Sequence, residues 1–156
     1  MNLEQLGLLG VFLGGAIPWL EAIVVVPAGL LFGLDPFWVV VAAVVGNAIT
    51  IFLFAYLGSA IRQWFRSKRK AKNQDKPDRF AKAQSLFDRY GIFGLALISP
   101  VSVGTQFAAA VAVAAGVKPL RAALLITAAT ALWAIAIAGL MLFIGLDNWI
   151  GFTDPQ

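Results

Sequence analysis

Gly33-Leu34-Asp35-Pro36 closes one long apolar stretch of this chain, and Gly116-Val117-Lys118-Pro119 closes a second one 83 positions later. A proline interrupts each stretch, Pro18 in the first and Pro100 in the second. Each closing motif is followed by an apolar segment with small polar residues near its middle, such as Gly46-Asn47 in the first half. An internal repeat of this kind decides the architecture before any local feature does. The pattern is typical of a transporter-like membrane protein made of two halves, with broken helices at its site of function.

The composition excludes an ordinary soluble domain. Hydrophobic residues make up 60% of the 156 residues, charged residues only 13%, and the mean hydropathy is +0.84. We therefore expect one membrane domain, residues 1–156. The chain has neither cysteine nor histidine, which removes disulfides and the commonest metal and proton-relay ligands. No metal, no cofactor and no enzymatic activity are expected, because no nucleophile and base occur at a recognisable spacing.

The charged residues are separated along the chain. All twelve lysines and arginines lie between Arg62 and Arg121, whereas the residues before Arg62 include only acidic charges. A basic run next to hydrocarbon-length helices indicates a cytoplasmic loop under the positive-inside rule, rather than a nucleic-acid patch. We expect a protein of the prokaryotic plasma membrane with residues 62–89 in the cytoplasm and no nucleic-acid partner.

The interrupted apolar stretches have an unusual length. Residues 3–33, as one helix, would reach about 46 Å at 1.5 Å per residue, against a hydrocarbon core of about 30 Å. This is too long for one crossing and too short for two. Pro18 and Pro27 are expected to break the helix, so residues 3–33 are predicted to enter and leave the membrane on the same side. Residues 91–116, broken near Pro100, repeat the pattern.

Two other apolar segments, 36–60 and 119–144, are long enough to span the membrane. Apolar residues at nearly helical spacing within 80–90 indicate a short amphipathic helix on the membrane surface. The predicted organisation is a first repeat over about 3–61, a basic cytoplasmic linker over 62–89, and a second repeat over about 90–145.

Charge separates two possible topologies. If all four apolar segments crossed, Lys118 and Arg121 would lie on the side opposite to the 62–89 linker. If the interrupted segments are re-entrant, every basic residue is cytoplasmic and both termini are external, as the positive-inside rule requires. We expect the second arrangement: an all-α integral membrane protein with an inverted repeat of two re-entrant helical hairpins and two transmembrane helices.

Glu21 is the ionisable side chain that lies deepest within an apolar segment. A charge near the bilayer centre is costly, so such residues usually face a cavity and serve function. Moving a carboxyl group out of water penalises its charged form, which suits Glu21 to proton coupling. The alternative is a structural carboxyl group that bonds to a hairpin backbone or to Asn47.

The second interruption contains a run of polar residues. A helix that restarts near Gly104 would point backbone N–H groups inward, a site for an anionic headgroup. Alternatively, these groups satisfy one another where the two hairpins meet. Asn47 and Thr130, at equivalent places in the two spans, either join the cavity or form interhelical hydrogen bonds. The expected pathway residues are Glu21, Asn47, Ser99, Ser102, Thr105, Gln106 and Thr130.

Three basic residues lie near the expected cytoplasmic mouth. Arg89, Lys118 and Arg121 could collect phosphate headgroups there. Anchoring at the membrane interface explains them equally well.

Several short motifs resemble a known family. Gly-Ala-Ile-Pro-x-x-Glu followed by Pro-Ala-Gly within 15–29, then Gly46-Asn47, Tyr56-Leu57-Gly58, Tyr90-Gly91 and the break at Pro100, are similar to the small multidrug export protein family and the wider DedA superfamily. This resemblance covers about residues 12–140. It implies two inverted repeats and membrane transport, in some members proton-dependent translocation of an isoprenoid phosphate or scrambling of phospholipids.

The resemblance also places individual residues and shows departures. Glu21 matches the acidic residue that follows the proline of the first hairpin, whereas Asn47 stands where many DedA members carry an acid. The paired arginines that DedA members show around the second proline are absent, since Leu97, Ser99, Ser102 and Val103 surround Pro100. The principal anion ligands of that superfamily are thus missing.

From the sequence we predict a transporter that moves a lipid-like or amphipathic substrate, with Glu21 as the candidate for proton coupling. One alternative is a small multidrug or cation exporter, which a single intramembrane carboxylate suits better. Another is a non-transporting membrane scaffold. Expected partners are membrane lipids, an amphipathic substrate, protons and further copies of the chain in a homo-oligomer.

Overall fold

The computed structural model describes residues 3–18, 20–70 and 79–145, with the backbone alone at 59–70 and 79–80, and all regular secondary structure within them is helical. Residues 71–78 of the predicted 62–89 linker and the residues after 145 lie outside the described residues. The helices are α1 (Leu3–Ala16), α2 (Glu21–Leu31), α3 (Pro36–Lys70), α4 (Arg79–Ser102), α5 (Thr105–Ala114) and α6 (Pro119–Ile144).

The first apolar segment folds as two short helices, as its interruption predicted. The turn between α1 and α2 contains Pro18, and the backbone N–H of Leu20 donates to the Ile17 carbonyl at 3.1 Å. Pro27 does not break the chain as expected, because it lies inside α2. A proline there removes one hydrogen bond, to the carbonyl of Ile23, and the rest of the helix continues.

The second apolar segment is also interrupted, close to the predicted position. Gly91, at φ 66° and ψ −168°, separates the amphipathic first part of α4 from its apolar second part. Pro100 lies inside α4, and the helix ends two residues later at Ser102. The break itself occurs at Gly104, whose φ of 98° is accessible to glycine at little cost.

The two closing motifs form the same turn. At the end of α2, the N–H groups of Gly33 and Leu34 donate to Leu30 and Gly29. The equivalent bonds at the end of α5 run from Gly116 and Val117 to Val113 and Ala112, each 83 residues later. Both glycines have positive φ, 73° and 98°. The two closing motifs therefore make the same pattern of backbone hydrogen bonds, which resembles the Schellman end of a helix.

Within the part of the chain that the structure describes, two helices are long and apolar enough to cross a membrane, namely Pro36–Gly58 within α3 and the whole of α6. At 1.5 Å per residue they reach about 35 Å and about 39 Å, against the hydrocarbon thickness of about 30 Å. The helix α3 continues beyond the predicted end at 60, because residues 59–70 contain neither proline nor glycine to stop it.

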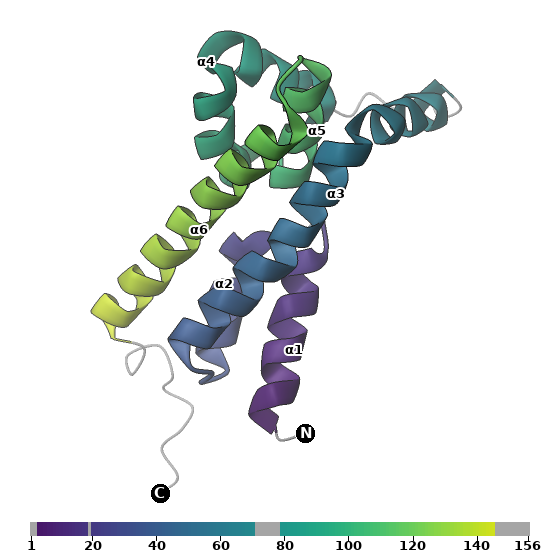
Figure 1. The fold of residues 1–156 in the computed structure, drawn as a ribbon. Helices are drawn as coiled ribbons and strands as arrows, with labels where there is room; N and C mark the ends of the chain where they lie inside the picture. Colours follow the sequence, from purple (N-terminus) through teal and green to yellow (C-terminus); the bar gives the residue numbers. More distant parts are fainter. Residues whose placement is uncertain (1–2, 19, 71–78, 146–156) are drawn as a thin grey trace, which may run out of the picture.

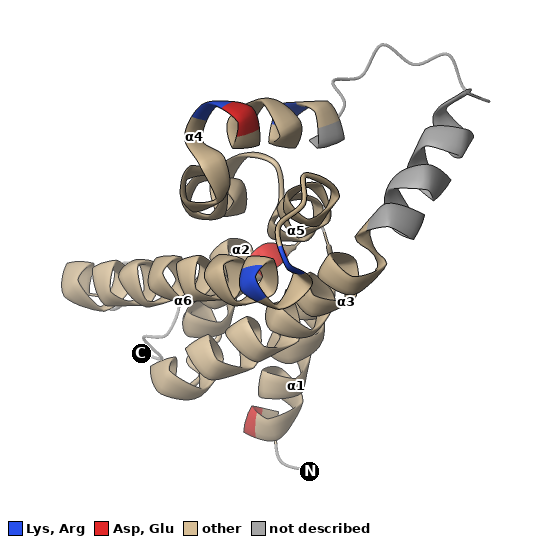
Figure 2. Ribbon diagram, turned by 45° about the horizontal axis from the view of Figure 1, so that its top comes forward, with Lys and Arg blue, Asp and Glu red and all other residues tan. Residues whose placement is uncertain are grey.

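Figure 1 shows how these elements are arranged. The start of α1, the turn between α2 and α3, and the end of α6 lie at one end of the molecule, whereas α4 and the turn between α5 and α6 lie at the other. The basic side chains that the structure describes belong to α4 and to the start of α6, at this second end (Figure 2). Asp35 and Lys118, equivalent in the two closing turns, consequently lie at opposite ends.

The buried apolar residues form two clusters separated by polar residues. One cluster joins α1, α2, the start of α3 and the second half of α6. The other joins α4, α5, the middle of α3 and the first half of α6. Asn47 lies on α3 between Ala43 of the first cluster and Ile51 of the second, and Thr130 lies on α6 between Ile126 and Ala134. A layer of buried polar side chains thus crosses the middle of the fold.

Glycines allow α1 and α5 to touch α3 through the backbone. A Cβ atom added at Gly15 of α1 would lie 2.5 Å from the Ala43 carbonyl oxygen, and one added at Gly46 of α3 would overlap the Phe12 carbonyl oxygen. One added at Gly58 would lie 2.9 Å from the Ala110 Cα. Small residues serve the same purpose at many interfaces between membrane helices.

The packing of α1 on α3 predicts the effect of a single added methyl group. We expect Gly46→Ala to lower the free energy of unfolding by about 1–3 kcal/mol, because the new Cβ has to displace the backbone of α1. The measurement is thermal unfolding of the purified protein in detergent micelles. Gly139→Ala is the matched control, since nothing lies within 4 Å of its added Cβ. An equal melting temperature for both variants would contradict the backbone contact.

Candidate functional site

The two helix breaks meet at one cavity of about 270 Å³. The turn between α1 and α2 and the first residues of α2 form one wall, and the end of α4 with Gly104 forms the other. The lining residues are Pro18, Glu21, Ile23, Val24, Pro100, Val101, Ser102, Val103 and Gly104. Residues from the two interrupted segments, about 80 positions apart, therefore share a single site, as expected for broken helices in transporter-like folds.

Glu21 is the ionisable residue among those that line this site. It is the first residue of α2 and is only 7% exposed. Its Oε1 atom accepts a hydrogen bond of 2.7 Å from the backbone N–H of Thr105, the first residue of α5. The first N–H groups of a helix have no partner within the helix and carry its positive dipole end. The carboxyl group of the first hairpin thus caps the helix of the second.

This arrangement changes the expected role of the α5 N-terminus. The sequence suggested that its N–H groups would bind an anionic headgroup, whereas the structure shows the Thr105 N–H bonded to Glu21. The alternative in which the hairpins satisfy one another describes this N–H correctly. An anion from outside would have to compete with a carboxyl group that already belongs to the chain.

Residues on both sides of the contact between Glu21 and Thr105 have positive φ. This conformation is strained at Glu21 and is suited to the glycine at position 104. Glu21 has φ 26°, the one positive value among the described residues other than glycine. Such conformations cost of order 1–3 kcal/mol and are frequent at functional sites. Gly104 lies 83 positions after Glu21 and also has positive φ, and an added Cβ there would lie 3.1 Å from Glu21 Oε1. Glycine is needed here both for its conformation and for the approach of the carboxyl group.

A hydrogen-bonded network extends from Glu21 into the core. The Thr105 hydroxyl oxygen lies 3.5 Å from Glu21 Oε1, 3.4 Å from Asn47 Oδ1 and 3.2 Å from Gln106 Oε1. It has one proton to donate, and it also accepts from Asn47 Nδ2 at 3.3 Å. Gln106 Nε2 donates to Asn47 Oδ1 at 2.7 Å and to Thr50 Oγ1 at 3.3 Å. Asn47, Thr105 and Gln106 are fully buried, so these bonds offset the cost of their burial.

Four of the predicted pathway residues, Glu21, Asn47, Thr105 and Gln106, are therefore brought together. Thr50 joins them although the sequence interpretation did not single it out. Its hydroxyl group donates to the Asn47 carbonyl at 2.9 Å. Its position three residues after Asn47, on the same face of α3, was the signal that could have indicated it.

The two predicted serines lie near the cavity with different surroundings. Ser99 is buried, and its hydroxyl group donates to the Ala96 carbonyl at 3.2 Å. Pro100 has no N–H for that carbonyl, so Ser99 replaces a missing helix bond. Ser102 lines the cavity and is exposed, and its hydroxyl group donates to Ile98 within its own helix.

The remaining predicted residues lie away from this network. Thr130 is buried, but its hydroxyl group bonds to Ile126 of the same helix at 2.9 Å. Arg89, Lys118 and Arg121 are exposed, and Arg89 lies over the Tyr90 ring at 5.2 Å. Among the described residues that line the cavity, Glu21 is the only ionisable one. The basic residues whose side chains the structure describes are thus outside the site, at the end of the molecule that carries α4 (Figure 2).

A family model described as "Putative small multi-drug export protein" matches residues 21–137. The matched range begins at Glu21 and includes both closing turns and every member of the hydrogen-bonded network. No curated protein and no solved structure matches the chain.

The network predicts an unequal cost for two polar substitutions. We expect Gln106→Leu to lower the free energy of unfolding by about 1–3 kcal/mol, because Asn47 Oδ1 loses its 2.7 Å donor while staying buried. Ser102→Ala, on an exposed residue bonded only within its helix, is expected to change it by less than about 0.5 kcal/mol. Chemical unfolding in micelles measures the free energy of unfolding of both variants. A loss for Gln106→Leu as small as that expected for Ser102→Ala would show that the network contributes no stability.

Proposed function

The chain belongs to the small multi-drug export protein family, and on that premise we propose that it exports amphipathic cations through the cavity between its two helix breaks. The observation that carries the proposal is the charge of this cavity. Glu21 is the sole ionisable residue of its described lining, and the lysines and arginines with described side chains lie elsewhere. A cation that enters an apolar membrane region is stabilised by a carboxylate within a few ångströms.

Proton coupling follows because the Glu21 carboxyl group binds either the cation or a proton. A deprotonated Glu21 attracts the cation, and a proton that binds Glu21 removes this attraction and releases the cation. The proton and the cation then exclude each other at the same group, which couples their opposite movements. The strained backbone at Glu21 and its bond to Thr105 support this role, because both hold the carboxyl group at the cavity.

A lipid-like substrate with an anionic head, such as an isoprenoid phosphate or a phospholipid, is the second candidate. The exposed basic residues Arg89, Lys118 and Arg121 favour it, since they would attract phosphate headgroups at the end of the molecule that carries α4. Two observations oppose it: the Thr105 N–H is already bonded, and no arginine or lysine is among the described lining residues. The DedA relationship and a scaffold without transport activity both remain predictions of the sequence.

We also propose that both hairpins are re-entrant and that the two halves form an inverted repeat. The helices α1, α2 and α5 have 14, 11 and 10 residues, so they reach only about 21, 17 and 15 Å of a core about 30 Å thick. The opposite placement of Asp35 and Lys118 supports a cytoplasmic end that carries α4 and an external end that carries the start of α1. The homo-oligomer and the prokaryotic plasma membrane remain expectations.

The topology can be tested with cysteines at equivalent positions, because the chain has none of its own. We expect an impermeant maleimide added to intact cells to label Asp35→Cys and to leave Lys118→Cys unlabelled. Both residues precede the first proline of a long helix, so the local backbone is matched. Labelling of Lys118→Cys in sealed cells would show that the second interrupted segment crosses the membrane.

The transport proposal is tested in proteoliposomes with tetraphenylphosphonium and an isoprenoid phosphate as alternative substrates. We expect a pH gradient to drive movement of the cation, and Glu21→Gln to reduce this movement about tenfold or more, the change that a loss of about 1.4 kcal/mol produces. Glutamine keeps an oxygen for the Thr105 N–H, so the contact between the hairpins is retained. Full pH-driven cation movement by Glu21→Gln would refute the coupling role, and movement of the phosphate alone would favour the second candidate.

A further inference from the structure

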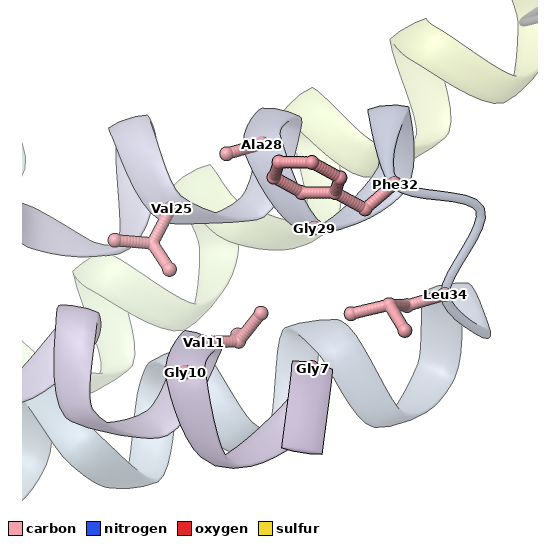
Figure 3. A pocket seen from close by; sticks show the side chains of 8 residues that line it. All are labelled: Gly7, Gly10, Val11, Val25, Ala28, Gly29, Phe32 and Leu34. Carbon is pink, nitrogen blue, oxygen red and sulfur yellow. The ribbon is translucent and has the colours of Figure 1, made fainter. Parts of the chain in front are cut away.

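A second cavity, of about 370 Å³, lies between α1 and α2. Figure 3 shows Val11, Val25, Phe32 and Leu34 around it, and Gly7, Gly10, Ala28 and Gly29 complete the lining. No side chain in this lining carries a polar group. It is separate from the residues that line the Glu21 cavity, since the two sets have no member in common.

The chemistry of this lining selects an apolar occupant. A buried water needs two to four polar partners, and apolar cavities tend to stay dry or to bind hydrocarbon. Backbone groups of helical residues are already bonded within their helices, so the three glycines add surface without adding partners. The space beside Gly10 is open, since nothing lies within 4 Å of an added Cβ atom there.

Both cavities lie along the same face of α2. Glu21, Val24, Ala28 and Phe32 are spaced by three or four residues, which places them on one side of a helix. Val24 lines the cavity at Glu21, and Ala28 and Phe32 line the apolar one. Ala28 lies seven positions after Glu21, about 10 Å along the helix axis at 1.5 Å per residue. One face of α2 thus presents a carboxyl group at its start and an apolar cavity toward its end.

We propose that the cavity between α1 and α2 binds the hydrocarbon tail of the same amphipathic cation whose charged head lies at Glu21. The inference rests on the proposed function and adds a substrate class to it: elongated cations with an unbranched apolar tail, rather than compact cations. Affinity is then expected to increase with tail length, since each methylene group buried from water adds to binding.

The test compares binding of tetramethylammonium and decyltrimethylammonium to the full chain in nanodiscs. We expect Gly10→Leu, which fills the apolar cavity, to weaken decyltrimethylammonium binding about tenfold or more and to leave tetramethylammonium binding unchanged. Gly139→Leu is the matched control, because Gly139 is also an exposed helical glycine with nothing within 4 Å of its added Cβ, and it lies outside both linings. We expect it to change neither affinity, and Glu21→Gln to weaken both.

The outcomes separate this inference from the proposed function. If Gly10→Leu binds both cations as the native chain does while Glu21→Gln binds neither, the tail site is refuted and the cation site at Glu21 stands. If Glu21→Gln binds both cations normally, the cation site fails. If, in that case, Gly10→Leu still loses decyltrimethylammonium binding, the cavity binds a hydrocarbon tail whose head does not lie at Glu21. This result would also overturn the inference. Equal competition by neutral decyl maltoside would identify a membrane-lipid tail as the occupant, against the proposal.

A second variant covers the case in which Gly10→Leu does not fold. Gly10→Cys adds a small side chain with open space around its Cβ, in a chain that has no other cysteine. We expect decyltrimethylammonium to protect this cysteine from maleimide and tetramethylammonium to leave it reactive. Absence of protection by the long-chain cation would refute the tail site.

Discussion

The hydrogen bond between the Glu21 carboxyl group and the N-terminus of α5 is the contact on which the centre of this fold depends. Each interruption of an apolar segment releases backbone groups that the surrounding hydrocarbon cannot satisfy. Here the second interruption is satisfied by a side chain at the edge of the first. Three features surround this bond: the positive φ of Glu21, the glycine at position 104 and the network through Asn47. The bond holds the one ionisable group of the described cavity lining in a layer between two apolar clusters.

The parts of the fold that depend on local chemistry could be predicted from the sequence. Prolines and positive-φ glycines constrain their own backbone, so the break at Pro18 and the closing turns at Gly33 and Gly116 lie where the pattern indicated. Segment length and apolarity similarly indicated two helices that could cross a membrane. The prediction was wrong at Pro27, which remains inside a helix instead of breaking it. The membrane-length part of α3 lies where it was expected, but its apolarity did not show that the helix would continue to Lys70.

The pairing of the site residues could not be predicted, because it depends on which helices pack together. Asn47 and Thr130 occupy equivalent positions, but Asn47 faces Thr105 and Gln106 of α5, whereas Thr130 bonds within its own helix. The sequence showed an available helix N-terminus and an isolated carboxyl group, without showing that one would bind the other. That choice comes from contacts between residues 84 positions apart, which no local pattern encodes.

The glycine contacts also determine which helices can move relative to one another. At Gly15, Gly46 and Gly58, helices α1 and α5 meet α3 with backbone atoms in the interface, and backbone has no rotamers with which to adjust. These three helices are therefore expected to move as one stiff body. Helix α2 meets α6 through side chains instead, in a cluster that includes Val26, Ala134 and Ala138. Relative movement between helices is therefore expected first at contacts made by side chains alone, such as that between α2 and α6, and last at the three glycine contacts.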